Sequence, residues 1–373
     1  MRVRLHPWFR GNPISTTTRP EFSSAERQEP AAHRDMATPF REYTDQRPPI
    51  TEPARVSEGV AQDALDVLAE LAHDCVLLSR AADSTGLLRF HRLRRLIHEI
   101  CEEILVCEAK TVPREAILRA VEPARSVHAS SPFVRRIQDW PRGYTGDFET
   151  IQRIMKPVNR AEKGSIGYLC ESYWLTSPMA QQIRNRMAVQ ASCILERCAE
   201  AGSLRVLSMG CGGCSDLQSI MTPLANMIGS HDFFLTDRDP EARSAAGEVL
   251  GRIAGLCRWL DSESSLTPAS FEEFAPYDLI VTGIMFDTLE NRDAVSLLRQ
   301  ADRLLAPGGR ILFTNIAAPN PYRPLMEYLA SWILIERAED DLQRLCSDAG
   351  IASERLSMCR DGSGLAILAE VIK

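Results

Sequence analysis

The sequence lacks any excess of basic residues. It has 43 Lys and Arg against 50 Asp and Glu, a formal net charge of −7, and an isoelectric point of about 5.6. This balance leaves no broad positive field, which argues against electrostatic binding to nucleic acid. The sequence also lacks an apolar run of the roughly 20 residues that a membrane-spanning helix needs. We therefore expect neither a nucleic-acid partner nor a membrane span.

Metal-ligand and disulfide spacings are also missing, although the chain has eleven cysteines and seven histidines. Cys211 and Cys214 have the C-x-x-C spacing of a redox pair or of half a zinc site, but no second pair stands at ligand spacing. We interpret both as small residues that fill a tight turn, and we expect no metal. The other cysteines lie mostly in apolar helical patterns, which favours a reducing, cytoplasmic location.

The most informative segment is 203–217, SLRVLSMGCGGCSDL. A short apolar run in it ends in Gly210-Cys211-Gly212-Gly213, and a later apolar run, Phe233-Phe234-Leu235, is followed by the acid Asp237. Glycines after a first strand let the backbone approach a ligand, and an acid after the second strand can accept hydrogen bonds from ribose hydroxyls. The pattern predicts a nucleotide-binding βαβ unit.

Two cofactors compete for this layout. A dinucleotide site requires G-x-G-x-x-G, but Ser215 stands where the last glycine belongs. S-adenosylmethionine (SAM) carries no phosphate, so a tight G-x-G loop is sufficient for it. Two later landmarks agree with SAM. Residues 277–283 predict a fourth strand introduced by an acid, and residues 304–313 predict a helix end, a Pro-Gly-Gly turn and a fifth strand. Together these landmarks resemble a class I SAM-dependent methyltransferase.

This resemblance implies an α/β fold, namely a Rossmann-like class I methyltransferase domain with seven strands and an antiparallel last hairpin. We expect a disordered extension over residues 1–55, which are rich in Pro, Arg, Ser and Thr. Residues 56–175 predict a helical N-terminal or lid domain, and 176–373 the SAM-binding methyltransferase domain. Apolar residues at helical spacing place helices from about residue 57, over 87–110 and over 114–121. These helices pack either on the catalytic domain or on a second copy of the chain in a homodimer.

Residues 140–149 connect the two parts and hold an unusual density of polar side chains between glycines. Asp147 is placed to N-cap a helix over 148–155. Ser177 and Pro178 stand at the N-cap and first position of a second helix that ends near residue 199. Arg184 and Arg186 on that helix are interpreted as a solvated face, with carboxylate binding as the alternative.

A narrower resemblance covers about residues 130–373. Its motifs are WPRGYTGDFETI (140–151), SPMAQQIRNR (177–186), DLIVTGIMFD (278–287), Pro307-Gly308-Gly309 with Asn315, and Met326 with WILIER (332–337). They resemble a group of bacterial methyltransferases of extracellular-factor (3-hydroxypalmitic acid methyl ester) biosynthesis. Thr145, Ser208, Cys214 and Glu336 depart from the pattern of that group. These departures bear on the methyl acceptor more than on the cofactor.

The resemblance implies roles for individual residues. Tyr144 and Asp147 are the implied catalytic or lid residues, which close over the methionine end of SAM and the acceptor. Asp261 has an equally good interpretation as a turn residue. The implied cofactor-binding residues are Gly210, Cys211, Gly212, Asp237, Arg238, Asp261, Gly283 and Met285.

The function implied is methylation of a small-molecule or acyl acceptor in secondary or signal metabolism, with O- or carboxyl methylation favoured. A carboxylate needs no general base, whereas a hydroxyl or amine profits from one. The candidates for such a base are His128, Tyr144, Asp147 and Glu149. One alternative is an N- or C-methyltransferase that tailors a peptide or polyketide. Another is a SAM-binding scaffold without activity.

Overall fold

A computed structural model describes residues 58–81, 86–227, 230–260 and 269–373 of the chain. The extension expected over 1–55 and the candidate Asp261 lie outside the described residues. None of the described helices is both long enough and apolar enough to cross a bilayer.

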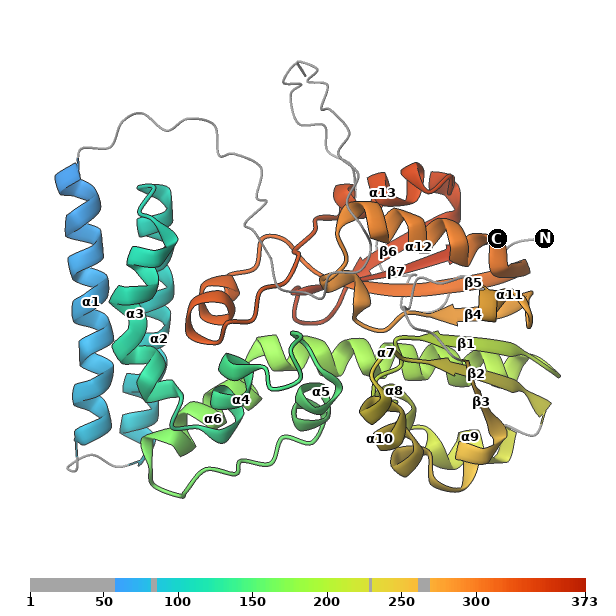
Figure 1. Cartoon of the computed structure of the whole chain (residues 1–373), viewed down its shortest axis with the longest axis horizontal. Helices are drawn as coiled ribbons and strands as arrows, with labels where there is room; N and C mark the ends of the chain where they lie inside the picture. The colour runs from blue at the N-terminus through green and yellow to red at the C-terminus, as the bar shows by residue number, and fades with distance from the viewer. Residues whose placement is uncertain (1–57, 82–85, 228–229, 261–268) are drawn as a thin grey trace, which may run out of the picture.

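Three long helices form the N-terminal part, drawn in blue to green in Figure 1. They are α1 (Glu58–Arg80), α2 (Gly86–Ala109) and α3 (Arg114–His128). The helix expected over 114–121 is therefore longer than predicted. Its apolar spacing continues through Ile117, Val121, Ala124 and Val127, all buried. This burial outweighs the hydrogen bond that Pro123 cannot donate inside the helix.

Four shorter or connecting helices lead to the sheet: α4 (Pro132–Asp139), α5 (Phe148–Met155), α6 (Ile166–Thr176) and α7 (Pro178–Glu200). Each begins at a residue whose side chain accepts a hydrogen bond from the backbone N–H three positions on. These caps are Ser131, Asp147, Ser165 and Ser177. The two caps predicted from the sequence, Asp147 and Ser177, are confirmed.

The sheet has seven strands in the order β3-β2-β1-β4-β5-β7-β6. The first five along the chain pair in parallel, and β7 is antiparallel to both β5 and β6. This confirms the predicted fold with its antiparallel last hairpin. The strands are β1 (Arg205–Met209), β2 (Asp232–Thr236), β3 (Cys257–Trp259), β4 (Tyr277–Val281), β5 (Leu305–Ile316), β6 (Leu356–Arg360) and β7 (Ala366–Ile372).

One local prediction about the sheet is wrong. Pro307-Gly308-Gly309 is not a turn that precedes the fifth strand, because β5 begins at Leu305 and runs through it. The register against β4 shifts between Tyr277 and Leu279. The three residues therefore form an irregularity within the strand.

Successive residues of the central strands enter different cores, as the period of two in a strand requires. Val206 and Leu279 pack with α7, α9 (Met221–Met227) and α10 (Pro240–Leu250). Leu207 and Ile280 pack with α12 (Asn291–Leu304) and α13 (Glu339–Asp348) on the opposite face. The sheet is thus a middle layer between two layers of helices, visible at the right of Figure 1.

Short elements complete the fold: α8 (Ser215–Gln218), α11 (Ala269–Glu272), the 3₁₀ helices η3 (Gly251–Leu256), η4 (Met285–Asp287) and η6 (Ser353–Arg355), and a π-helix, η5 (Leu325–Leu329). The π-helix belongs to the core of the N-terminal helices, although it follows β5 in the sequence. Arg125 of α3 donates to the carbonyl oxygen of Tyr328 at 2.6 Å. Helix α7 joins this core through Ile183 and the sheet core through Ile194. The helical part and the sheet part therefore share packing.

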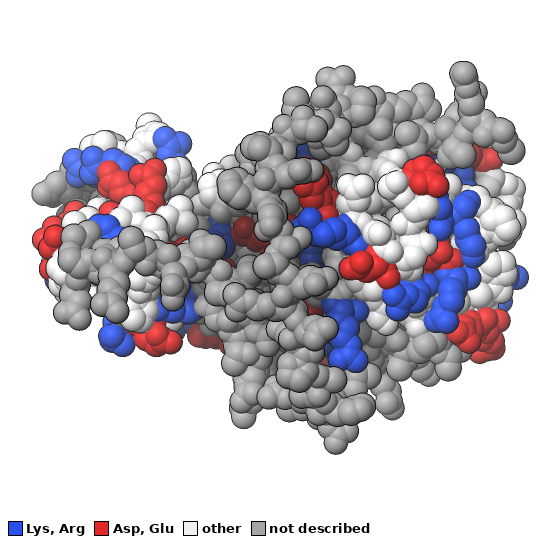
Figure 2. All heavy atoms as spheres, turned by 90° about the horizontal axis from the view of Figure 1, so that it is seen from above, with Lys and Arg blue, Asp and Glu red and all other residues white. Residues whose placement is uncertain are grey.

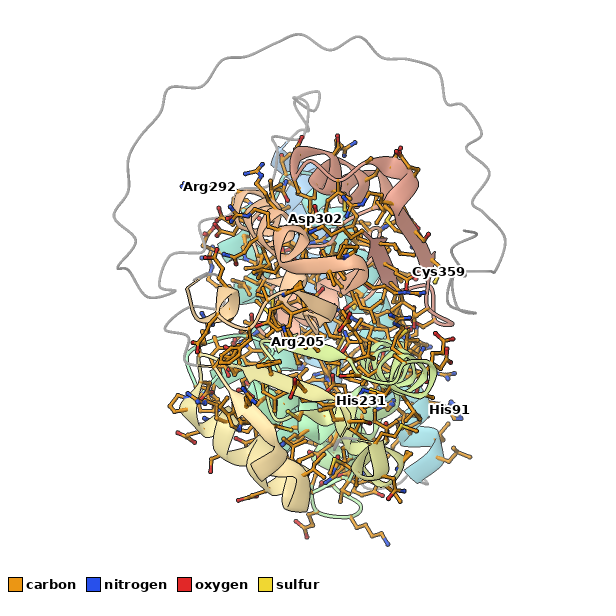
Figure 3. All side chains as sticks on the ribbon, turned by 90° about the vertical axis from the view of Figure 1, so that its right-hand side faces the viewer. His91, Arg205, His231, Arg292, Asp302 and Cys359 are labelled. Carbon is orange, nitrogen blue, oxygen red and sulfur yellow. The ribbon has the colours of Figure 1, made fainter. Side chains whose placement is uncertain are left out.

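The described surface carries mixed charge. Figure 2 shows acidic and basic side chains interspersed on the face seen from above. Figure 3 looks at the right-hand end of Figure 1 and labels Arg205, the first residue of β1, and His231, which directly precedes β2. The residues that follow β1 and β2 therefore lie at the other end of these strands.

Candidate functional site

A cavity of about 170 Å³ lies where β1, β2 and β4 end. This edge, outside the carboxyl ends of parallel strands, is where open α/β sheets bind ligands. The sheet contributes Gly210–Gly213, Asp237 with Arg238, and Gly283–Met285 to the cavity wall. Other parts of the wall come from the segment 144–151, from α7, from Ser215 and Asp216 of α8, from 287–289, and from Trp332 and Leu334. Of the residues for which the resemblance implies a catalytic or cofactor-binding role, all except Asp147 and the undescribed Asp261 line this cavity.

The glycine loop after β1 is shaped by backbone conformation. Gly210 and Gly212 have φ values of +60° and +53°. A Cβ on Gly210 would lie 2.5 Å from the sulfur of Met285, too close for any real contact. The loop therefore presents bare backbone to the cavity, as the sequence predicted.

Asp237 holds this loop in place. Its Oδ2 accepts a hydrogen bond from the Gly212 N–H at 2.8 Å, and its Oδ1 accepts one from the Asp239 N–H at 2.9 Å. Burial raises the pKa of the Asp237 carboxyl, against the lowering effect of these hydrogen bonds. A carboxylate oxygen has more than one acceptor site, so both oxygens retain capacity for ligand hydroxyls.

One of the two cysteines of the loop lacks the exposed, low-pKa thiol that a reactive pair needs. Cys214 is fully buried, and a hydrogen bond with Cys211 together with burial raises its thiol pKa well above the usual value. A raised thiol pKa disfavours the thiolate that redox and metal chemistry need. No group of three or more potential ligands is arranged for a metal among the described residues.

Tyr144 lines the cavity and contacts the segment that follows β2. Its hydroxyl donates to Asp239 at 2.8 Å, and the Arg238 guanidinium lies 5.1 Å from the centre of its ring. Burial, followed by the hydrogen bond to Asp239, raises the pKa of Tyr144. The phenol is therefore neutral and serves the site as an aromatic wall and a hydrogen-bond donor.

Asp147, for which the resemblance implies a catalytic or lid role, does not line the cavity. Its side chain is fully buried, and its Oδ1 accepts the Thr150 N–H at 2.8 Å. Its Oδ2 accepts from Arg136 at 2.8 Å. Both oxygens thus fix the start of α5, the helix whose Phe148 and Ile151 form the cavity wall.

The interpretation of Arg186 as part of a solvated face is also wrong. Its side chain is fully buried and pairs with Asp287 through two hydrogen bonds, of 2.7 and 3.1 Å. The reason is the position of α7 between the two cores. Arg184 is partly buried instead and donates to the carbonyl oxygens of Ile154 and Leu175.

The sequence analysis missed two polar residues that α7 contributes to the wall, Gln182 and Gln190. They lie four residues before and after Arg186 and form a buried polar stripe with it. Polar side chains at this interval, next to apolar Ile183 and Met187, were a usable signal. Trp332 had no comparable local signal, because only the fold after η5 brings it to the cavity.

The other candidate bases lie elsewhere. His128 is fully buried outside the cavity wall, and burial lowers its pKa. Its Nδ1 bonds to the Ala124 carbonyl oxygen at 2.8 Å. Glu149 pairs with Arg136 and Arg153. Among the described residues, no histidine lines the cavity.

No protein-family model matches the chain. A highly reducing polyketide synthase from Cordyceps militaris is 30% identical over 131 residues, which are 34% of this chain and 5% of that protein. The chain thus spans only a small fraction of the length of this curated relative.

Solved structures are similar at low sequence identity. A possible exported protein from Bordetella parapertussis is 17% identical, with a TM-score of 0.51, over 86% of this chain and 99% of that one. The CMeT domain of the citrinin polyketide synthase is 14% identical, with a TM-score of 0.44, over 84% and 90%. At such identities the first of these likenesses shows a shared fold only.

Proposed function

We propose that the chain is a SAM-dependent methyltransferase. The observation that carries the proposal is the glycine loop at the end of β1, bound through Gly212 to the carboxylate of Asp237 at the end of β2. It lies in a seven-stranded sheet whose last strand is antiparallel. This arrangement offers bare backbone and a ribose-binding acid at one edge.

An unpartnered buried acceptor supports the fit of SAM. Gln190 donates its amide to the Gly283 carbonyl oxygen at 3.3 Å, which leaves its Oε1 free. That oxygen is buried in the cavity wall and has no hydrogen-bond partner. A buried acceptor without a partner costs free energy, and the ammonium group of SAM would satisfy it.

The loop fits a dinucleotide poorly. A pyrophosphate binds the N-terminus of a long helix, but α8 has four residues and carries Asp216 in its first turn. Asp216 is buried in the cavity wall, and burial raises its pKa to about 6. At neutral pH its carboxylate would repel a phosphate, whereas it would attract a cationic ligand.

When bound, SAM supplies a methyl group that its sulfonium has already activated. The Gly210–Gly213 backbone and the Asp237 carboxylate would hold SAM. The chain's own residues align the acceptor and exclude water. The apolar side chains of the cavity wall that keep water out are Phe148, Ile151, Ile183, Met187, Ile284 and Leu334.

For the acceptor we propose a small-molecule or acyl compound of secondary or signal metabolism, methylated on oxygen, as in extracellular-factor biosynthesis. Carboxyl methylation suits a wall in which Tyr144 is neutral and Asp287 is paired with Arg186. A second candidate is C-methylation of a polyketide, favoured by the 131-residue match to a polyketide synthase.

Calorimetric titration tests the cofactor. We expect the protein to bind SAM and S-adenosylhomocysteine (SAH), and to bind NADH poorly. Asp237→Ala should weaken SAM binding by roughly 1–3 kcal/mol, because ribose hydroxyls would lose their partner. Asp232→Ala, at the exposed start of β2, is the matched control. NADH binding without any response to SAM would end the proposal.

A further inference from the structure

Two buried N–H donors, from residues that line the cavity, lack adequate partners. They are Nε2 of Gln182 on α7 and Nε1 of Trp332 after η5. Neither was expected from the sequence. Buried donors without partners are rare, and one that faces a cavity indicates a ligand atom.

The orientation of the Gln182 amide is fixed by its neighbour. Arg186 has only donors, and its NH1 donates to Gln182 Oε1 at 3.3 Å. The NH₂ group must therefore point the other way, where its one contact is the sulfur of Met179 at 3.8 Å. A thioether is a weak acceptor, so this amide group is nearly unsatisfied.

Trp332 is 1% exposed, and its indole N–H has no partner. The nitrogen lies toward Gly146, 3.9 Å from the place that a Cβ on that glycine would take. Both Trp332 and Gly146 line the cavity. The Trp332 ring packs edge-on against the ring of Trp140, with 5.4 Å between the ring centres.

One short set of hydrogen bonds connects the two segments that carry these donors. Gln182 accepts from Arg186, and Arg186 pairs with the side chain of Asp287. The carbonyl oxygen of Asp287 accepts the Ile335 N–H at 2.7 Å, three residues beyond Trp332. Through this ion pair, α7 and the segment after η5 are fixed to each other.

We propose that Gln182 and Trp332 form a two-donor subsite for the acyl oxygen of the methyl acceptor. This inference rests on the proposed methyltransferase function. Both donors are neutral, and the nearby Arg186 is neutralised by Asp287, so the subsite suits a carbonyl oxygen or one carboxylate. The apolar side chains around it accommodate the rest of an acyl chain. A free acid and a thioester share this chemistry.

The experiment titrates acyl probes into SAH-saturated protein and into protein without SAH. The probes are octanoate and the octanoyl thioester of N-acetylcysteamine, with 1-octanol as the probe that lacks an acyl oxygen. We expect Trp332→Phe and Gln182→Met each to weaken acyl binding roughly three- to tenfold, the effect of one lost hydrogen bond. Binding of SAH should not change, and 1-octanol, whose hydroxyl is a weaker acceptor than a carboxylate, should lose less affinity than octanoate.

Trp174→Phe is the matched control, because Trp174 also has a buried, unpartnered indole N–H but does not line the cavity. Preference for octanoate or for the thioester separates the two acyl sources. The subsite is wrong if both variants bind the acyl probes as the wild type does, or if 1-octanol loses affinity equally. Failure of the wild type to bind SAH contradicts instead the proposed methyltransferase.

Discussion

The two halves of the cavity are constructed differently. The half proposed to bind the cofactor consists of backbone from consecutive residues, Gly210–Gly213, and of an acid at the next strand end. The half proposed to bind the acceptor consists of side chains from three distant segments, 146–151, α7 and 332–334. The first half depends on local backbone conformation, whereas the second depends on how remote elements pack. Substitutions should therefore act locally in one half and across the fold in the other.

Arg186→Met should have the largest effect. It leaves Asp287, which is 3% exposed, buried without its cation. Breaking such a pair costs about 3–5 kcal/mol of stability. Chemical denaturation measures this loss. Arg197→Met on the same helix, whose partner Glu200 is exposed, should cost less than about 1 kcal/mol. Equal losses for both variants would mean that this pair does not fix α7 to the segment after η5.

Asp147→Ala comes next and tests the cap of α5, the helix that contributes Phe148 and Ile151 to the cavity wall. It removes the cap of α5 and the partner of Arg136, which should cost about 2 kcal/mol in the free energy of unfolding. Tyr144→Phe, which loses one partly buried hydrogen bond, should cost about 1 kcal/mol or less. Thermal melting compares the two. A smaller loss for Asp147→Ala than for Tyr144→Phe would mean that Asp147 does not act as a buried helix cap.

Gly210→Ala should act on the cofactor half alone. A side chain at φ +60° is strained, and its Cβ would meet the sulfur of Met285. We expect SAM affinity to fall about tenfold or more, a change of about 1.4 kcal/mol, with little effect on binding of an acyl probe. Gly247→Ala in α10, where a Cβ meets nothing within 4 Å, is the control and should leave affinity unchanged. Unchanged SAM binding in Gly210→Ala would contradict the role of the loop.

Glu336→Gln should leave stability at low pH nearly unchanged and should act only on the way stability changes with pH. Burial raises the pKa of Glu336 from 4.5 to about 7, so between these values the folded chain holds a proton that the unfolded chain has lost. The stability of the wild type should therefore fall as pH rises from about 4.5 to about 7. Glu336→Gln should flatten this slope, whereas Glu354→Gln, at an exposed position, should not. Denaturation at a series of pH values measures both slopes.

The distinction between local backbone conformation and the packing of remote elements also explains which features the sequence could predict. The glycine loop, the acid after β2 and the caps at Asp147 and Ser177 depend on neighbours within a few residues, so their patterns predict them. The seven strands and the antiparallel last hairpin followed from the resemblance that those landmarks carry.

The remaining features depend on tertiary packing. Arg186 has the sequence surroundings of a surface residue and is buried only because cores pack on both sides of α7. Asp147 was predicted correctly as a cap, but its complete burial requires Arg136 from α4. Trp332 reaches the cavity only because the π-helix before it packs on the N-terminal helices.

Helix α7 also fixes the distance between two parts of the cavity wall. Gln182, at the proposed acyl oxygen, and Gln190, at the cofactor edge, are eight residues apart on one continuous helix, which corresponds to about 12 Å along its axis. Neither end can shift without the other, because Arg186 anchors the helix between them. The span from the acyl oxygen to the methyl donor is therefore constant. Acceptors whose nucleophilic atom lies at a different distance from the acyl oxygen should therefore be poor substrates, whatever the length of the tail.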